Sequence, residues 1–349
     1  MSLSIDFLCN DGSPLRVTMN SLWGLDGRAG IGGSELAMLT LCDEWTKKGH
    51  KVKLYNDPTE VGVSEFEQLP MSAFDPDEDR DVLIIFRTPR FDVVGAKGLK
   101  VWLSFDQFTL GDRPFDRFAT VPDKIVVISE YHAEYLKETY GIENTIVIDL
   151  PVRVHDLDEI KVDKVPNRII FTSVPDRGLM NLHALWPEIR SEIPEATLVI
   201  TSDYRLWGSG HPNNGRYFAH WIGIEGVQFK GAMKRDEYLE EICKADIFFY
   251  PHKAQNPELF CVSCAEAQCA GAYPVTSDVG ALATTNMGTI IEGDPEDVEW
   301  RFKAKKAVID LLSNREGLKF EQNRVLKMAF DRFNPDTILE QWEKKVFNG

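Results

Sequence analysis

Two glutamates in the second half of the chain are the side chains whose spacing best suggests chemistry. Glu258 and Glu266 have seven residues between them. Glu266 falls in a predicted helix among small and apolar neighbours, where a carboxylate must be paired or bound to hydroxyl groups. One carboxylate can accept from both members of a vicinal hydroxyl pair, so a sugar or a ribose is a candidate ligand. A core acid satisfied by backbone N–H groups is the alternative.

A glycine-rich turn in the first half of the chain is a candidate phosphate site. Gly30, Gly32 and Gly33 precede a helix predicted over residues 34–48. The backbone N–H groups of such a turn can approach a phosphate closely, and the helix dipole favours the anion. The spacing is GxGG, which differs from the GxGxxG dinucleotide fingerprint. A tight turn that needs positive φ would explain the glycines equally well.

Short apolar runs that alternate with helical stretches must position these residues. Such runs are typical of parallel strands covered on both faces. They lie at residues 5–9, 51–55, 82–86, 100–104, 124–129, 145–149, 168–174, 197–201, 227–229, 247–250 and 273–276. Glu258 follows the run 247–250, at the carboxyl edge where open α/β sheets bind ligands. Two consecutive βαβ series predict an α/β protein of two Rossmann-like, doubly wound domains, face to face with a cleft between them.

A charged, proline-bounded segment at residues 151–166 indicates the interdomain linker. We therefore expect an N-terminal domain over residues 1–155 and a C-terminal domain over 156–334. Residues 335–349 form a predicted helix with Pro335 in its first turn, and we expect this helix to complete the N-terminal domain.

The composition limits the partners and the compartment. The chain has 349 residues, of which 43% are hydrophobic, and a formal net charge of -16. So acidic a surface repels nucleic-acid phosphates and anionic lipid. No run approaches the roughly 18 apolar residues of a membrane span, and the start does not resemble a signal peptide, so we expect a cytoplasmic protein without a transmembrane segment. The lone pair Cys261 and Cys264 is interpreted as buried thiols and not as a zinc site.

Three segments together resemble the retaining family-four glycosyltransferases of the GT-B class, the glycosyl transferases group 1. Two glutamates with this spacing mark that family's donor site. The resemblance extends over residues 257–276, Gly280-Ala281-Leu282, Gly32-Gly33-Ser34-Glu35, 49–52 and 173–179. It spans nearly the whole chain, in the family's order. It implies a hexosyltransferase-type enzyme that moves a sugar from a nucleotide diphosphate sugar to an acceptor hydroxyl, with retention of configuration.

The resemblance also implies roles for individual residues. Glu258 would contact hydroxyls of the transferred sugar, and Glu266 those of the ribose. Arg177 would neutralise the diphosphate leaving group, with backbone N–H groups at a helix N-terminus capping the same phosphates. Glu35 would lie on the acceptor side. The implied donor-binding residues are Gly32, Gly33, Arg177, Glu258, Leu259, Phe260, Cys261, Val262 and Glu266.

The chain departs from the family pattern in three places. The family's arginine before its basic residue is absent, since residues 171–173 read Phe-Thr-Ser. A second cation among Lys230, Lys234 and Lys253 would then assist Arg177. The family's histidine after the fourth strand region is also absent, which leaves Asp106 as the nearest polar substitute at the catalytic site. The usual glutamate near residues 284–285 is missing as well.

We expect no metal and no cofactor beyond the donor nucleotide sugar. Asp75 and Asp77 form an acidic triplet with Pro76, but the triplet lies in a charged loop instead of at a strand end. His132, near a predicted helix start, is expected at the surface.

Two other functions compete with this prediction. One is a non-catalytic sugar-nucleotide-binding protein of the same fold. The other, less favoured, is a nicotinamide-dependent oxidoreductase, which would leave the two glutamates without a role. The acceptor, whether a glycan, a lipid or a small molecule, and the donor base and sugar stay open.

Overall fold

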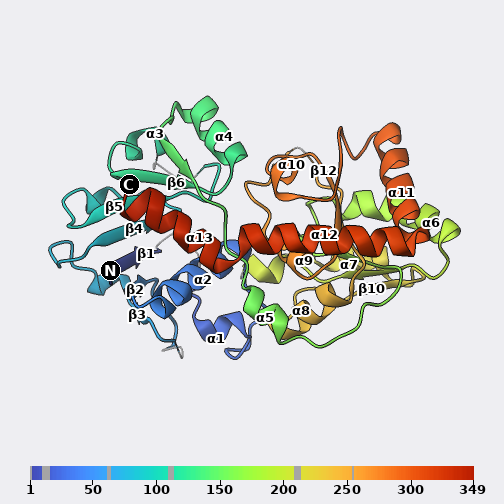
Figure 1. Cartoon of the computed structure of the whole chain (residues 1–349), viewed down its shortest axis with the longest axis horizontal. Helices are drawn as coiled ribbons and strands as arrows, with labels where there is room; N and C mark the ends of the chain where they lie inside the picture. The colour runs from blue at the N-terminus through green and yellow to red at the C-terminus, as the bar shows by residue number, and fades with distance from the viewer. Residues whose placement is uncertain (1, 10–15, 61–63, 109–113, 208–213, 254) are drawn as a thin grey trace. The chain divides into compact units, whose positions relative to one another are not determined.

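The computed structural model describes residues 2–9, 16–60, 64–108, 114–207, 214–253 and 255–349 (Figure 1). The chain forms two compact units. The N-terminal unit consists of Met1–Asp26, Ser34–Pro151 and Pro335–Gly349, and the C-terminal unit of Gly27–Gly33 and Val152–Asn334. The glycine-rich turn is thus grouped with the C-terminal unit, whereas the last helix of the chain is grouped with the N-terminal unit.

The N-terminal unit is built on a seven-stranded parallel sheet of order β3-β2-β1-β4-β5-β6-β7. Its strands are β1 (Ser4–Leu8), β2 (Lys51–Tyr55), β3 (Glu67–Leu69), β4 (Val82–Phe86), β5 (Leu99–Leu103), β6 (Lys124–Val127) and β7 (Thr145–Val147). Every residue of β4 is buried, as a central strand covered on both faces requires. The strand order reverses between β1 and β4, so the loops at their carboxyl ends diverge and leave room for a ligand.

Helices cover this sheet, and capping residues in the sequence mark where α4 begins and ends. They are α1 (Met19–Leu22), α2 (Gly33–Lys47), α3 (Phe115–Phe118), α4 (Glu130–Tyr140) and α13 (Pro335–Trp342), with 3-10 turns at Met71–Ala73 and Phe91–Val93 and a short π-helix at Glu343–Phe347. The hydroxyl of Ser129 accepts a hydrogen bond from the His132 N–H and caps α4, which ends at Gly141 in the left-handed conformation. Trp342 of α13 packs edge-on against Trp45 of α2, with ring centroids 5.2 Å apart. The last helix therefore contributes to the N-terminal core.

The C-terminal unit is built on a six-stranded parallel sheet of order β10-β9-β8-β11-β12-β13. Its strands are β8 (Arg168–Phe171), β9 (Thr197–Ile200), β10 (Val227–Phe229), β11 (Ile247–Tyr250), β12 (Tyr273–Ser277) and β13 (Thr289–Ile291). The strand order reverses between β8 and β11, which places the loops after these two strands at the topological switch point of the sheet.

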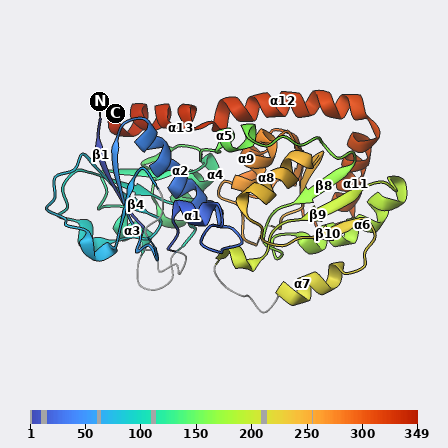
Figure 2. The same cartoon turned by 90° about the horizontal axis from the view of Figure 1, so that it is seen from below.

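The helices of the C-terminal unit pack around this sheet. They are α5 (Val154–Asp158), α6 (Leu179–Glu192), α7 (Asn214–Trp221), α8 (Arg235–Lys244), α9 (Val262–Cys269), α10 (Leu282–Thr285), α11 (Val298–Ser313) and α12 (Arg315–Phe333), with a 3-10 turn at Tyr204–Trp207. The long helix α12 runs beside α9 and is one of its main packing partners (Figure 2). Among the described residues, no helix has both the length and the apolar character that crossing a bilayer demands.

Candidate functional site

Arg177 and Glu258 meet at the switch point of the C-terminal sheet. Arg177 lies in the loop between β8 and α6, and Glu258 in the loop between β11 and α9. The Arg177 Nη1 atom is 2.8 Å from Glu258 Oε1. The Tyr250 hydroxyl, at the end of β11, donates to the same carboxylate oxygen at 2.6 Å. Because β8 and β11 are neighbours in the sheet, residues 81 positions apart in sequence come into contact.

The ion pair keeps Glu258 charged although its side chain is buried. Burial raises the pKa of the Glu258 carboxyl, but the Arg177 charge and the hydrogen bonds from Tyr250 and Arg177 outweigh burial and hold that pKa below its usual value. The Glu258 charge in turn raises the pKa of the Arg177 guanidinium. Glu258 is therefore an ionised carboxylate at neutral pH and can only accept hydrogen bonds.

Two glycines fix the backbone that carries these side chains. Gly178 has φ +104°, and a Cβ atom there would lie 2.2 Å from the Pro251 carbonyl oxygen. Gly280 has φ +62°, and its Cβ would lie 2.4 Å from the carbonyl oxygen of Glu258. No side chain fits at either place, so each loop packs directly against backbone. The loops of Arg177 and Glu258 are thus held in one position by close packing.

The N-terminus of α9 follows Glu258 directly. Cys261, the residue before the helix, has φ +74°, an uncommon conformation for a residue other than glycine. The Cys264 and Ala265 N–H groups bond to the Cys261 carbonyl, so the first turn of the helix is closed. The earliest N–H groups of any helix lack a partner inside the helix, and they present partial positive charge to an anion. Leu259 and Phe260, in the preceding loop, are buried.

The glycine-rich turn, which is grouped with the C-terminal unit, lies near the start of α9. A Cβ atom on Gly33 would be 3.2 Å from the Val262 Cγ2 atom. Gly30 has φ +137°, and its Cβ would be 2.7 Å from the Met233 carbonyl oxygen. Gly32 between them is buried. The structure therefore brings the turn close to the helix end that follows Glu258.

Glu266 lies inside α9 and already has a charged partner. Its side chain is buried, and its Oε1 atom is 2.9 Å from Arg235 Nη1. Burial and the nearby Glu266 charge raise the pKa of the Tyr238 hydroxyl. Pairing for this buried acid was expected, but Arg235 was not identified from the sequence. No local signal marks Arg235, since it stands in the charged run Lys234–Glu237 at the start of α8 and looks like a surface residue.

Glu35 and Asp106 are brought together in the N-terminal unit by an arginine that the sequence analysis missed. Arg87 follows β4 with φ +59°, and its Nε and Nη2 atoms bind the two Asp106 oxygens at 2.9 and 3.1 Å. The Arg87 Nη1 atom is 3.5 Å from Glu35 Oε1. The three side chains lie at the carboxyl edge of the sheet, and a strained backbone at such a place is typical of a functional site.

One expectation about this region is wrong. His132 is fully buried and not at the surface, and its Nε2 atom is 3.4 Å from the Ser104 hydroxyl. Burial lowers the pKa of the His132 imidazole to about 4, so the ring is neutral at physiological pH. The expectation failed because His132 lies on the same face of α4 as the buried Leu136, four residues further on, and α4 packs against β6 and β7.

The three lysines considered as second cations differ in their surroundings. Lys230 Nζ is 2.9 Å from Glu241 Oε1, and Lys253 is paired with Glu296. Lys234 is exposed just before α8.

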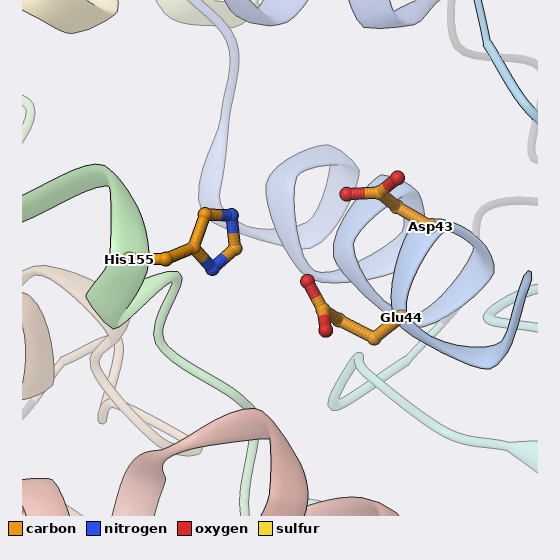
Figure 3. A group of neighbouring side chains, drawn as sticks. All are labelled: Asp43, Glu44 and His155. Carbon is orange, nitrogen blue, oxygen red and sulfur yellow. The ribbon is translucent and has the colours of Figure 1, made fainter. Parts of the chain in front are cut away.

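The acidic groups outside the site are held by neighbours of their own. Asp75 accepts from the Asp77 N–H in an exposed turn. Figure 3 draws Asp43 and Glu44 side by side on α2, where both bind Lys47, and His155 on α5. His155 belongs to the C-terminal unit and contacts Asp156 there at 3.1 Å. We assign no metal site to these side chains. Cys261 and Cys264 are buried free thiols, and burial raises the pKa of each.

Solved structures share the fold of this chain. Sucrose-phosphate synthase from Thermosynechococcus elongatus aligns with a TM-score of 0.70 and 14% identity over 99% of both chains. HepE from Anabaena in complex with UDP-glucose aligns with a TM-score of 0.70 and 14% identity, over 99% of this chain and 100% of that one. AviGT4, a glycosyltransferase involved in avilamycin A biosynthesis, aligns with a TM-score of 0.68 and 16% identity over 99% of this chain and 98% of that one. The protein therefore has the GT-B fold, with two Rossmann-like α/β domains.

A family described as glycosyl transferases group 1 matches residues 167–314 of the chain. This stretch includes Arg177, Arg235, Glu258 and Glu266. A comparison with curated proteins gives no match.

Proposed function

We propose that the protein is a glycosyltransferase that moves a sugar from a nucleoside diphosphate sugar to an acceptor hydroxyl, with retention of configuration. The Arg177–Glu258 pair before the N-terminus of α9 is the observation that carries this proposal. The group 1 family match over residues 167–314 supports it. HepE, which shares the fold, is solved with UDP-glucose, so uridine diphosphate sugars are the first donors to test.

Arg177 is proposed to stabilise the leaving diphosphate. Glycosyl transfer has an oxocarbenium-like transition state and releases an anion, so positive charge placed in advance near the diphosphate lowers the barrier. A guanidinium has five N–H donors, and the bond to Glu258 uses Nη1, so Arg177 can bind a phosphate without leaving Glu258. The start of α9 and the turn at Gly33 would add backbone N–H donors to the same phosphates. This set of donors supports a metal-independent reaction.

Glu258 is proposed to bind hydroxyls of the transferred sugar. Among the residues that the structure describes, both hydrogen bonds of its side chain, from Arg177 and Tyr250, fall on Oε1. The second carboxylate oxygen is then an acceptor for a sugar hydroxyl. Glu266 is proposed to take the ribose hydroxyls. Leu259 and Phe260 would shape the donor loop between them.

The acceptor is proposed to bind at the carboxyl edge of the N-terminal sheet. Glu35 and Asp106 offer carboxylate oxygens there, and Arg87 holds Asp106 through two hydrogen bonds. Asp106 is the proposed polar group of the catalytic site in place of a histidine. The side chain of Asp106 is 28% exposed, so a hydroxyl can reach it.

Calorimetric titration tests the donor site. The protein is titrated with UDP, ADP, GDP and their glucose conjugates, and the same series is repeated with Arg177→Ala. Arg324→Ala is the matched control, because Arg324 is also an arginine of the C-terminal unit but pairs with Glu321 on the surface of α12. We expect micromolar binding of one diphosphate, lost in Arg177→Ala and kept in Arg324→Ala. A folded wild-type protein that binds no member of the panel would contradict the proposal.

A further inference from the structure

Three buried charged side chains link α5, α8 and α9 in the C-terminal unit. Arg235 Nε is 2.8 Å from Asp156 Oδ2, and Arg235 Nη1 is 2.9 Å from Glu266 Oε1. The side chains are 5%, 3% and 5% exposed for Arg235, Asp156 and Glu266, so water does not separate them. We call these three residues the Arg235 triad. The planar Arg235 guanidinium thus connects Glu266, the residue proposed to bind the ribose, to Asp156 in α5.

The outer end of the triad is held by further contacts. Asp156 also binds Arg153 Nε at 3.0 Å and His155 Nε2 at 3.1 Å. Burial raises the pKa of the Asp156 carboxyl, but the His155 hydrogen bond and the Arg235 and Arg153 charges outweigh burial and hold that pKa well below its usual value. Burial lowers the pKa of the Arg235 guanidinium, but the charges of Glu266 and Asp156 more than compensate. Asp156 and Arg235 are therefore both ionised at neutral pH.

Stability alone does not explain why these charges are buried. Removing ions from water costs several kcal/mol each, and an apolar replacement of a buried ion pair is often neutral or stabilising. The Arg235 Nη2 atom is also buried without a hydrogen-bond partner among the described residues, which adds to the cost. The guanidinium of an arginine is planar and rigid, so it can hold a bound carboxylate in one orientation.

We propose that Arg235 is a positioning residue for nucleotide recognition: it orients the Glu266 carboxylate toward the ribose hydroxyls, and Asp156 fixes Arg235. This inference rests on the proposed function, because it needs Glu266 to bind the ribose. A glutamate side chain has several rotatable bonds and can adopt many orientations. The bond from Arg235 Nη1 to Glu266 Oε1 restricts this freedom. Arg235 starts α8, and α8 packs on both β8 and α5, so the guanidinium rests on rigid elements. We therefore expect Arg235 to affect the preference of the protein for the ribose hydroxyls and not its affinity for the diphosphate.

The ribose preference of nucleotide binding separates this role from a merely structural one. The dissociation constants of UDP, 2′-deoxy-UDP and 3′-deoxy-UDP are measured for the full chain by calorimetry, with the ADP or GDP series in place of UDP if the protein prefers that base. The ribose ratio is the dissociation constant of a deoxy compound divided by that of its parent. A hydroxyl bound by a charged carboxylate gives a ratio of about ten or more in the wild type.

Arg235→Lys keeps the charge but loses the planar fork. We expect its ribose ratio to fall to within about threefold of one, while binding of the deoxy compounds changes little. Arg168→Lys is the matched control, because Arg168 also pairs with a buried glutamate of the same unit, Glu241, at 2.9 Å. The control should keep the wild-type ratio. If Arg235→Lys does not fold, Asp156→Asn decides the question, since it releases Arg235 and should lower the same ratio.

Each outcome supports or overturns the inference. A ribose ratio that stays at its wild-type value in Arg235→Lys, or in Asp156→Asn where that variant decides, would refute the positioning role alone, even if all affinities fell together. A wild-type ratio near one would remove the ribose contact of Glu266 and the inference with it, and leave the diphosphate site intact. Absence of any nucleotide binding by the folded wild type would instead refute the proposed function.

Discussion

Replacing Glu258 with glutamine removes one negative charge from the site with little change in shape. In the structure, Oε1 of this carboxylate accepts from Arg177 at 2.8 Å and from Tyr250 at 2.6 Å. A glutamine can keep one acceptor, but it binds a sugar hydroxyl more weakly and leaves Arg177 without its ion pair. A hydrogen bond to a charged group contributes about 1.5–3 kcal/mol, so we expect a turnover number about 10- to 150-fold lower in Glu258→Gln.

The effect on donor affinity and on stability should be smaller. The diphosphate contacts stay in place, so we expect the donor KM to change by less than about threefold if chemistry limits turnover. Breaking a fully buried pair costs about 3–5 kcal/mol, but the Arg177 side chain is 33% exposed and water can solvate it, so we expect a loss of about 1–2 kcal/mol in the free energy of unfolding. The pKa of Glu258 is below its usual value, so its contribution to stability is present above pH 4.5 and is lost as the pH falls below that value.

Steady-state kinetics with varied donor concentration, together with urea unfolding, measures both effects. Glu241→Gln is the matched control, since Glu241 is a buried glutamate paired with Arg168 and Lys230 away from the α9 N-terminus. We expect the control to lose stability but to keep its turnover number. Full activity in Glu258→Gln, or an equal loss of activity in the control, would refute the role given to Glu258.

Two further predictions concern the stability of the fold, at Gly178 and at His132. Gly178→Ala should lower the free energy of unfolding by on the order of 2–4 kcal/mol, because its Cβ would lie 2.2 Å from the Pro251 carbonyl oxygen. Gly141→Ala, at another positive φ but with open space around the Cβ, should lose only about 1 kcal/mol, and equal losses in urea unfolding would contradict the close approach. The pKa of His132 is lowered from 6.5 to about 4, so the unfolded chain takes up its proton first and stability falls as the pH drops through this window. Between pH 7 and 4.5 the wild type should lose about 2–3 kcal/mol more than His132→Phe, and parallel stability curves would show that the imidazole is not buried and neutral.

The fold could be predicted from the sequence to a large extent because parallel strands have a strong local signature. The predicted pair of doubly wound α/β domains is confirmed, and each of the predicted apolar runs forms a strand. The strands that were missed, β3 and β13, have three residues each, and β3 reads Glu-Gln-Leu. Such short edge strands are not visible as apolar runs. The long helices α11 and α12 were also not predicted, because their apolar residues are spread among many charged ones.

The candidate site could be predicted only where its residues stand in a local motif. Arg177, Glu258 and Glu266 lie in recognisable segments, and the structure places all three in the C-terminal unit. Their partners could not be predicted, because Tyr250 is a strand residue with an apolar neighbourhood and Arg235 is one charge among several. Arg87 was missed because its ion pair with Asp106 spans two neighbouring strand ends, a contact that depends on the strand order. These roles in the proposed reaction stay predictions.

Donor turnover tests the central claim most directly. The protein is incubated with the sugar conjugate of whichever diphosphate it binds, with a panel of sugar, lipid and small-molecule acceptors, and both the released diphosphate and the product mass are followed. The account predicts acceptor-dependent release of the diphosphate, a product heavier by one transferred sugar, and loss of both in Arg177→Ala. Tight donor binding by a folded protein without transfer or hydrolysis across the panel would contradict it and favour a sugar-nucleotide-binding protein with the same fold.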